Sequence, residues 1–569
     1  KNMLSAKVLY GLNKENTSRD SYIPSDIYYA LQRKSRGNLG YGKRQQSTLE
    51  GTLTFQHKFG ELLDMNLMAG MGRYLDSGDG SDISYENAND HIQGSSVGMA
   101  DGPFYPTSYK YKNEKRSQFV RGNFDLLGRY VVSASLRRDG TDKFFPSKKY
   151  ALFPSVSLAW KMNEESFIKN ISWINMLKLR ASYGETGSDN LGTTLYGIVT
   201  TTREDVQFNN NSVTYIPYIL SGANYEDVTW QKTVMKNIGL DFSVLRDRIW
   251  GSVDVFRNDV THLLGTAPTE LLGMHGTRPI NGGHYKRTGV DVSLNSLNLQ
   301  THDFKWTSQI TLSHYNAVWI ERMPNYDYQK YQKRKNEPMN AFYYYKTTGI
   351  INVDKSNMPE SQRSLGPAAC MPGYPIVEDK NGDGIIDVND SYMDNTLPKL
   401  YFGFGNTFTW KNFDLDIFMY GQLGVKKWND AYGNSIDVGG LSRGVDAHNV
   451  GIYSYNIWNT QTNTNGRFPG IAISKSVALP ENLGFDYTRE NASYIRVRNI
   501  TLGYNLGPKE LSVFKGYIRG IRVFVDFQNP LTFTKYKGYD PEINTSSSNL
   551  TGGQYPQMRV YSIGAKLTF

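Results

Sequence analysis

Apolar and polar residues alternate along segments of about ten residues throughout the 569-residue chain. The last segment places Tyr561, Ile563, Ala565, Leu567 and Phe569 on one face, with small or polar residues between them. Successive side chains of a β-strand point to opposite faces, so a period of two predicts strands with one apolar face. The chain is therefore all-β, and its architecture depends on what covers that apolar face.

The connections between these segments alternate in length. Short turns alternate with long connections, so that all the long connections fall at one end of the strands. The short turns include 58–61, 127–128, 245–246 and 411–412. The long connections are 74–116, 185–227, 259–285, 317–399, 424–492 and 530–556. The pattern predicts sixteen antiparallel strands near residues 3–11, 49–58, 62–73, 117–126, 129–138, 151–162, 174–184, 228–244, 247–258, 286–298, 303–316, 400–410, 413–423, 493–506, 519–529 and 557–569.

Two architectures use strands with one apolar face. A soluble sandwich turns that face inward, whereas a transmembrane barrel turns it toward lipid and keeps a polar lumen. Strands of about ten residues suit a tilted membrane crossing, and short turns at one end with long loops at the other are typical of outer-membrane barrels. We therefore predict a transmembrane antiparallel β-barrel with long extracellular loops, extending over residues 1–569 as one domain.

The composition agrees with a barrel and excludes a bundle of transmembrane helices. Mean hydropathy is −0.52, and no run of about 18 uncharged apolar residues occurs. The chain holds 40 Tyr, an excess that aromatic girdles at the two membrane surfaces would explain. On the predicted lumen face, we expect Arg137, Lys161, Lys178, Arg180, Arg522 and Lys566 to pair with Asp254, Asp414, Asp416 and Asp526 or with a plug inside the barrel.

The segment DKNGDGIIDVND matches the spacing of an EF-hand calcium loop. Its predicted ligands are Asp379, Asn381, Asp383, the carbonyl of Ile385, Asp387 and Asp390. The alternative is a turn rich in Asp, Asn and Gly. We favour a bound divalent cation, Ca²⁺ or Mg²⁺, that fixes the long 317–399 loop.

Enzyme signatures are absent from the sequence. The eight His residues form no HExxH pair, and neither a GxSxG elbow nor a GxxxxGK[ST] loop occurs. The single cysteine, Cys370, excludes an internal disulfide framework. A net charge of +9, spread along the chain, does not indicate a nucleic-acid partner.

Several segments jointly resemble the barrel of SusC/RagA-type TonB-dependent transporters of Bacteroidota outer membranes. They follow the order of that family from about residue 117 to the end of the chain. The matching segments are RRDGTDKF at 137–144, FPSVSLAWKMNEESF at 153–167, LKLRASYGETG at 177–187, residues 228–260, residues 378–424, SYIRVRNITLGYNLG at 493–507, NPLTFTKYKGYDPE at 529–542 and YPQMRVYSIGAKLTF at 555–569.

The resemblance implies a function in import without chemistry on the substrate. It implies a Ca²⁺- or Mg²⁺-type ion at Asp379–Asp390, a SusD-like surface lipoprotein as a lid, and dimers of such pairs. Oligosaccharides or peptides would be imported with energy from TonB, and Phe569 would be the signal for barrel assembly. The family has a plug and a TonB box before its barrel, and plugged barrels have about 22 strands. We therefore expect the chain to be part of a larger barrel, with the plug and TonB box outside it.

Two alternatives remain at the level of sequence. A complete 16-stranded passive porin has the same even strand number, and an outer-membrane enzyme or adhesin would need a convergent site at the rim. Aromatic residues in two long loops suit sugar faces, but they suit a protein lid equally, and we rank lid contact first. These residues are Tyr215, Tyr218, Tyr225, Trp428 and Tyr432.

Overall fold

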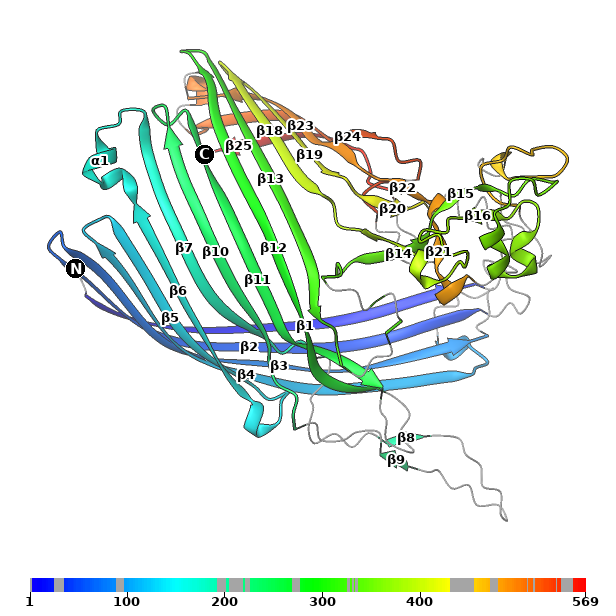
Figure 1. The fold of residues 1–569 in the computed structure, drawn as a ribbon. Helices are drawn as coiled ribbons and strands as arrows, with labels where there is room; N and C mark the ends of the chain where they lie inside the picture. The colour runs from blue at the N-terminus through cyan, green and yellow to red at the C-terminus, as the bar shows by residue number, and fades with distance from the viewer. Residues whose placement is uncertain are drawn as a thin grey trace.

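A computed structural model shows the arrangement of the predicted strands (Figure 1). It describes residues 3–24, 35–87, 97–191, 201–203, 218–220, 226–268, 277–324, 328–329, 332, 336–429, 455–470, 479–508, 510–514, 517–538, 540–543 and 556–569.

Sixteen antiparallel strands form one sheet in which each strand pairs with its neighbours along the chain. The short connections gather at one end and the long ones at the other, as predicted, and both chain ends lie at the end with the short turns (Figure 1). The strands are β1 (Leu4–Ile23), β2 (Arg36–Phe59), β3 (Leu63–Glu86), β4 (Phe104–Leu126), β5 (Tyr130–Thr141), β6 (Tyr150–Lys161), β7 (Ile174–Ser188), β10 (Gln231–Val244), β11 (Ile249–Pro268), β12 (Thr277–Gln300), β13 (Phe304–Glu321), β18 (Leu400–Trp410), β19 (Phe413–Leu423), β23 (Tyr494–Leu506), β24 (Gly520–Thr534) and β25 (Val560–Thr568).

All sixteen predicted strands are present, but six of them are much longer than predicted. Strands β1–β4, β11 and β12 have 20 to 24 residues each, so 74–116 and 259–285 are not long loops throughout. The prediction failed here because these extensions lack the apolar–polar alternation on which it relied. In the extensions of β3 and β4, glycines lie opposite tyrosines instead: Gly80 pairs with Tyr109, and Gly78 pairs with Tyr111.

The sheet does not close on itself within the part of the chain that the structure describes. Strand β1 pairs only with β2, and β25 pairs only with β24. Unpaired N–H and C=O groups cost several kcal/mol each in lipid, so a membrane barrel has no free edge. The alternative of a closed 16-stranded porin is therefore not the fold of these strands, whereas a larger barrel accommodates both free edges.

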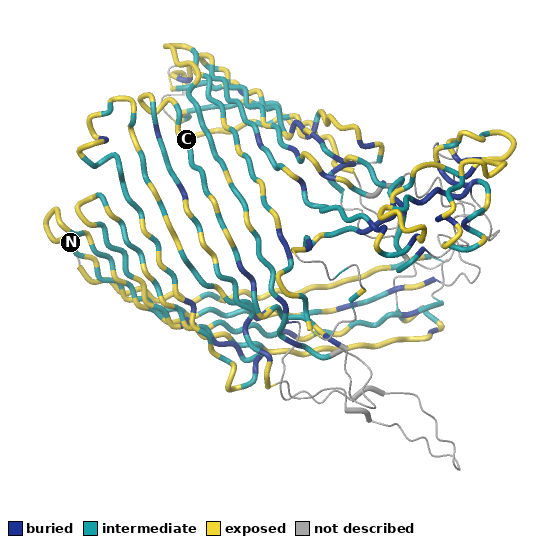
Figure 2. The backbone as a smooth tube through the Cα atoms, in the orientation of Figure 1, coloured by how far each residue is buried: buried dark blue, intermediate teal, exposed yellow. Residues whose placement is uncertain are grey.

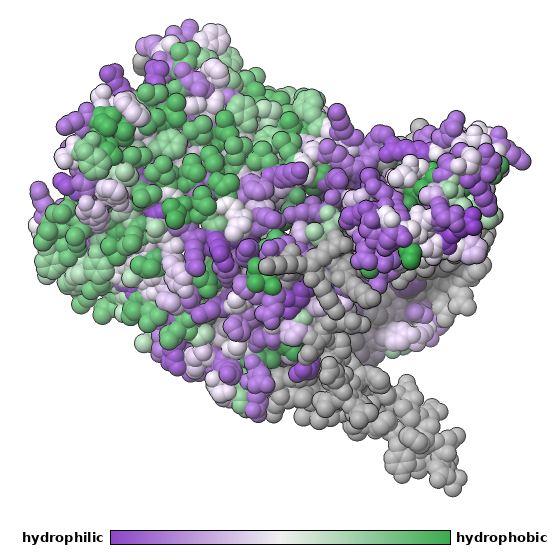
Figure 3. Space-filling model, in the orientation of Figure 1, coloured by the Kyte–Doolittle hydropathy of each residue, from purple (hydrophilic) through white to green (hydrophobic). Residues whose placement is uncertain are grey.

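The outer face of the wall carries the apolar residues. Figure 3 shows an apolar surface over the strands between β6 and β13 that gives way to a hydrophilic surface toward the long loops. Aromatic residues mark the end with the short turns, where Trp306 stacks on Phe408 and Trp410 stacks on Phe413. Such a row at the end of an apolar band is the expected girdle at a membrane surface.

The remaining elements are short, and buried residues concentrate near the long loops (Figure 2). No helix among the described residues is long and apolar enough to cross a membrane. The short elements are η1 (Val97–Met99), η2 (Pro146–Lys148), η3 (Met162–Glu164), α1 (Ser166–Lys169), β8 (Thr201–Arg203), β9 (Tyr218–Leu220), β14 (Ala341–Tyr345), β15 (Thr347–Ile350), η5 (Glu360–Leu365), η6 (Pro367–Cys370), β16 (Pro375–Val377), η7 (Val388–Asp390), β17 (Tyr392–Asn395), β20 (Lys426–Trp428), η10 (Pro480–Asn482), β21 (Gly484–Phe485), η11 (Asp486–Thr488), β22 (Arg489–Asn491) and η12 (Ser512–Phe514).

The outward orientation of alternate residues is testable at Leu158 on β6. Its side chain is exposed on the apolar face, whereas Ser157 belongs to the lumen face. We expect Leu158→Arg to destabilise the full-length protein by about 1–2 kcal/mol, because Leu158 lies near the end of β6 that carries the short turn, where a charge on the lipid face loses part of its hydration. Unfolding by urea in lipid vesicles measures this loss. Ser157→Lys is the matched control, and an equal loss in both variants would contradict the assigned faces.

Candidate functional site at the lumen wall and the extracellular mouth

Ion pairs on the lumen face neutralise much of its charge. Arg180 on β7 donates to both carboxylate oxygens of Asp241 on β10, at 2.7 and 2.9 Å, and reaches Asp254 on β11 at 3.1 Å. Gly239 lies between Arg180 and Asp254 in the ladder. A methyl group at Gly239 would lie 2.4 Å from Asp254 Oδ1, so the glycine allows the guanidinium to reach across one strand.

The same arrangement recurs near the end of the chain. Arg522 on β24 donates to Asp414 on β19 across Gly503 of β23. The expected pairing with Asp254 and Asp414 is confirmed for Arg180 and Arg522. Lys161 and Lys178 pair instead with Asp125 and Asp241, which the sequence did not indicate as partners. The wall therefore offers a polar surface of mixed charge rather than a field of one sign.

Other interior charges find partners that the sequence did not indicate. Arg137 pairs at 2.7 Å with Asp139 on its own strand. Asp416 and Asp526 accept hydrogen bonds from Thr407 and Thr501 respectively, at 2.5 and 2.6 Å, and form no ion pair with the described residues.

A group of aromatic side chains lies on the wall toward the mouth. The Arg287 guanidinium carbon is 3.7 Å from the ring centre of Tyr315, which stacks on Tyr401 at 5.7 Å with an interplanar angle of 2°. A groove of about 460 Å³ beside Tyr401 is also lined by Tyr420 and Glu542. Flat apolar ring faces next to hydroxyl and carboxylate groups can bind a sugar ring or a peptide side chain.

A buried arginine fastens the loop after β24 to the wall. The side chain of Arg496 on β23 is 2% exposed and donates to Asp540 at 2.8 and 2.9 Å and to Glu542 at 2.5 Å. Tyr420 on β19 donates to the same Glu542 carboxylate at 2.7 Å. We call Arg496, Asp540, Glu542 and Tyr420 the mouth clasp, because they join two wall strands to an extracellular loop.

The Asp540 carboxylate of the mouth clasp is stabilised in its charged form. Burial raises the pKa of Asp540, but hydrogen bonds from the backbone N–H groups of Glu542 and Gln557 and the ion pair with Arg496 outweigh it. The pKa of Asp540 therefore lies below its usual range. The clasp consequently stabilises the folded loop at neutral pH and weakens as the pH falls below about 4, through the folded pKa.

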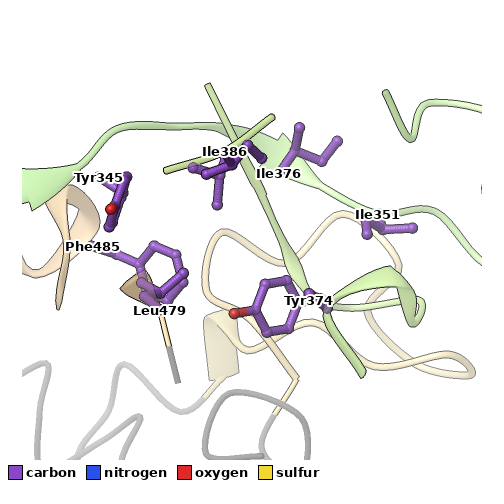
Figure 4. Close-up of a cluster of buried hydrophobic side chains, with 9 residues drawn as sticks. Tyr345, Ile351, Tyr374, Ile376, Ile386, Leu479 and Phe485 are labelled. Atoms are coloured by element: carbon purple, nitrogen blue, oxygen red, sulfur yellow. The ribbon is translucent and has the colours of Figure 1, made fainter. Parts of the chain in front are cut away.

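Two long connections fold together into an extracellular lobe, which comprises residues 341–395 and 479–491. Strand β14 pairs with β17 and with β21, so the two connections share one small sheet. Its hydrophobic core is shown in Figure 4, where Phe485 and Leu479 lie beside Tyr345. The core residues are Tyr345, Ile351, Ala369, Tyr374, Ile376, Val377, Ile386, Leu479 and Phe485.

A buried amide organises the lobe. Gln362 donates to the carbonyls of Ala369 and Pro375 at 3.0 and 3.1 Å and accepts from the N–H of Val377 at 3.0 Å. Burial also raises the pKa of Tyr374 to about 12, so its hydroxyl stays neutral. These loops therefore have a defined core of their own, unlike simple solvated connections.

The predicted calcium loop lies in this lobe and is closed by hydrogen bonds that backbone N–H groups donate to side-chain carboxylates. Asp379 accepts from the N–H groups of Gly382 and Gly384 at 2.8 and 2.9 Å. Asp390 is buried and accepts from the backbone N–H groups of Lys380 at 2.9 Å and of Asp387 at 2.8 Å. Gly382 and Gly384 have φ of 73° and 83°, a backbone conformation that favours glycine.

The donor set of this loop suits a hard cation, since all its candidate ligands are oxygens at EF-hand spacing. Nowhere in the described residues, however, do three His, Cys, Asp or Glu side chains gather closely enough to hold a metal. A bound cation would need Asp379, Asp383 and Asp387 to turn toward one another. The ion stays a prediction.

The predicted aromatic contact residues lie mostly outside what the structure describes. Tyr215, Tyr225 and Tyr432 fall in the undescribed segments. Tyr218 belongs to β9 and Trp428 to β20, which pairs with β22, but the description does not extend to their side chains. Their contact with a lid or a substrate stays a prediction, as does the role of Phe569 in assembly.

The family resemblance is confirmed by comparison with known proteins. Residues 4–529 match the family model described as "TonB dependent receptor-like, beta-barrel". The chain belongs to this family. Its barrels reside in the outer membrane, so the predicted fold and localisation are confirmed.

Curated relatives carry the names of receptors rather than of enzymes. TonB-dependent receptor P3 of Formosa agariphila is 27% identical over the whole chain, which covers 56% of that protein. TonB-dependent receptor SusC of Bacteroides thetaiotaomicron is 28% identical over 81% of the chain and 44% of that protein. The chain spans about half the length of the curated relatives it matches.

Solved structures show the same fold. The structure of the RagAB peptide transporter matches the whole chain with a TM-score of 0.77 and 21% identity, and the chain covers 60% of it. The RagAB peptide importer in its open–open state gives a TM-score of 0.78 at 22% identity.

Sequence reasoning missed the mouth clasp and the aromatic group. Arg496 follows the alternation of β23, but its partners Asp540 and Glu542 lie more than 40 residues away in a loop without periodicity. Tyr315 and Tyr401 are on strands that are adjacent only after the 322–399 connection closes. A signal existed in the segment GYDPE, where two acids follow a strand that ends near the mouth.

We expect Arg496→Met to destabilise the full-length protein by about 3–5 kcal/mol, because it leaves the Asp540 carboxylate buried without its cation. The double variant Arg496→Met with Asp540→Asn should recover most of this loss. Unfolding in detergent micelles and limited proteolysis near residue 540 measure the two effects.

Arg363→Met provides the matched control, because its ion pair with Glu360 is largely exposed and should contribute less than about 1 kcal/mol. If the mouth clasp did not stabilise the protein, the Arg496 and Arg363 variants would lose the same free energy of unfolding, and this result would contradict the prediction.

Proposed function

We propose that the chain is the barrel of an active outer-membrane importer of the SusC type. The observation that carries the proposal is a family match over residues 4–529, together with a wall whose outer face is apolar and whose lumen face is polar and ion-paired. Such a wall separates lipid from an aqueous path. The free edges of β1 and β25 fit a barrel of about 22 strands that includes strands outside this chain.

The proposed cargo is an oligosaccharide or a peptide. The stacked Tyr315 and Tyr401 with Arg287 provide ring faces and hydrogen-bond donors on the lumen wall. The structural neighbour named as a peptide transporter supports the peptide alternative. The mixed charge of the wall favours neutral or zwitterionic cargo over strongly charged ions.

The proposed partners are a SusD-like surface lipoprotein and TonB. The extracellular lobe has a packed core and stands at the end of the wall with the long loops, where a lid would dock (Figure 1). Energy from TonB would act through a plug that lies outside this chain. An assembly of two such barrel–lid pairs is part of the same proposal.

Uptake by cells tests active import. We expect cells that carry the full-length protein to take up labelled oligosaccharides or peptides from a mixed panel, and to lose this uptake when TonB is deleted or the proton gradient is collapsed. A protein lacking this barrel serves as the control for leakage. Uptake that persists without TonB at the same rate would support a passive porin and would sink the proposal.

We further propose that Asp379–Asp390 binds Ca²⁺ and thereby stabilises the extracellular lobe. Ile386, inside the loop, belongs to the core of the lobe, and its N–H donates to Ser364 Oγ at 2.8 Å. A cation held by the neighbouring carboxylates would therefore couple directly to that core. In this proposal the buried Asp390 carboxylate still closes the loop, because it accepts hydrogen bonds from the N–H groups of Lys380 and Asp387.

Calorimetric titration of Ca²⁺ into the full-length, chelator-treated protein measures this binding. We expect binding heat, and an increase in the melting temperature of the lobe, that disappear in Asp379→Asn with Asp383→Asn. The control is Asp354→Asn, because Asp354 makes a separate turn with Ser356 in the same connection. Absence of heat in the unmodified protein would refute the cation site.

A further inference from the structure

Three arginines lie side by side on the outward face of β3, β4 and β5. The ladder pairs Arg73 with Arg116, and Arg138 lies in the adjacent row. Cross-strand neighbours on one face have Cβ atoms about 5 Å apart, so these three side chains form one group. The lumen ion pairs of the same strands point to the other face, as Arg137 with Asp139 shows.

The group lies at the level where the wall leaves the membrane on the extracellular side. On β5, Tyr130 marks the periplasmic surface, since its hydroxyl and the indole N–H of Trp160 both donate to Glu165 in the turn. Ten residues separate Tyr130 from Gly140, which is opposite Tyr150 and Arg116. A tilted strand crosses a membrane in about 9–11 residues, so Arg116 and Tyr150 reach the outer headgroups.

The group carries excess positive charge. Arg73 and Arg116 both donate to one carboxylate, Glu114, at 2.9 and 2.6 Å, and their side chains are still 55% and 56% exposed. Arg138 stacks on the Tyr150 ring at 4.1 Å and makes no ion pair among the described residues. Two of the three guanidinium groups thus share one carboxylate, and the third has none among the described residues, on a surface that faces lipid.

A groove of about 510 Å³ joins this charge to an apolar floor. Its lining combines the apolar side chains of Val8, Leu49 and Met71 with Arg73, Arg116, Arg138 and Tyr150. Leu49 and Met71 are more than half exposed, as expected of residues in contact with acyl chains. The groove therefore matches an amphiphile that has both an anionic head and acyl chains.

We propose that this groove binds a phosphate-bearing lipid of the outer leaflet, with the phosphate held by Arg116, Arg138 and Arg73. Arginine is the side chain best suited to phosphate, because its planar guanidinium donates two parallel hydrogen bonds. The acyl chains of the lipid lie along Leu49 and Met71. The bound lipid also gives Arg138 a counter-ion, which the described residues do not supply.

Binding of a phosphorylated glycolipid (lipid A) to the full-length protein in detergent tests the proposal, with native mass spectrometry or a competition titration as the readout. We expect the double variant Arg116→Gln with Arg138→Gln to bind at least ten times more weakly than the unmodified protein. The unmodified protein should bind the dephosphorylated form of the same glycolipid more weakly than the phosphorylated form, by a similar factor. Millimolar inorganic phosphate should not displace the bound lipid.

Arg19→Gln is the control variant, because Arg19 is an exposed arginine outside the groove, paired with Asp82. It should bind the lipid like the unmodified protein. Melting temperature in lipid-free detergent shows whether the double variant is folded. Equal binding by a folded double variant, equal binding of the dephosphorylated glycolipid, or displacement by inorganic phosphate would each overturn the proposal.

Discussion

The hydrogen-bond ladder between neighbouring strands is the constraint on which the rest of this structure depends. In lipid, no water is present to satisfy backbone N–H and C=O groups, so every strand needs a partner on both sides. Fourteen of the sixteen strands have two partners, and only β1 and β25 have one among the described residues. The ladder also fixes which residues are neighbours across strands, and therefore where each ion pair, stacked ring and groove is formed.

Because the ladder fixes two faces, each strand has two independent roles. The outward residues meet lipid and headgroups, where Trp306 and Phe408 stack and where arginines find room at the extracellular edge. The inward residues neutralise one another, as Arg180 does with Asp241 and Asp254. Glycines such as Gly239 make this possible, since a side chain there would occupy the space that the guanidinium crosses.

The extracellular end of the structure is not bound by this constraint. Beyond the membrane, backbone groups can bond to water, so the chain is free to leave the ladder and build a hydrophobic core. The extracellular lobe does this around Tyr345 and Tyr374, and the mouth clasp ties a further loop to β19 and β23 through Arg496. These features create the surface on which recognition of cargo or of a lid would depend.

Alternation of residues, together with the alternating lengths of the connections, determined that the chain is all-β, that it has sixteen wall strands in sequential order, and which face of each strand meets lipid. Alternation is local, because it follows from the two-residue repeat of a strand. The partners of Arg496, the stack of Tyr315 on Tyr401 and the lobe core join residues that are far apart in sequence. Only the tertiary structure decided these, because they depend on how loops without periodicity return to the wall.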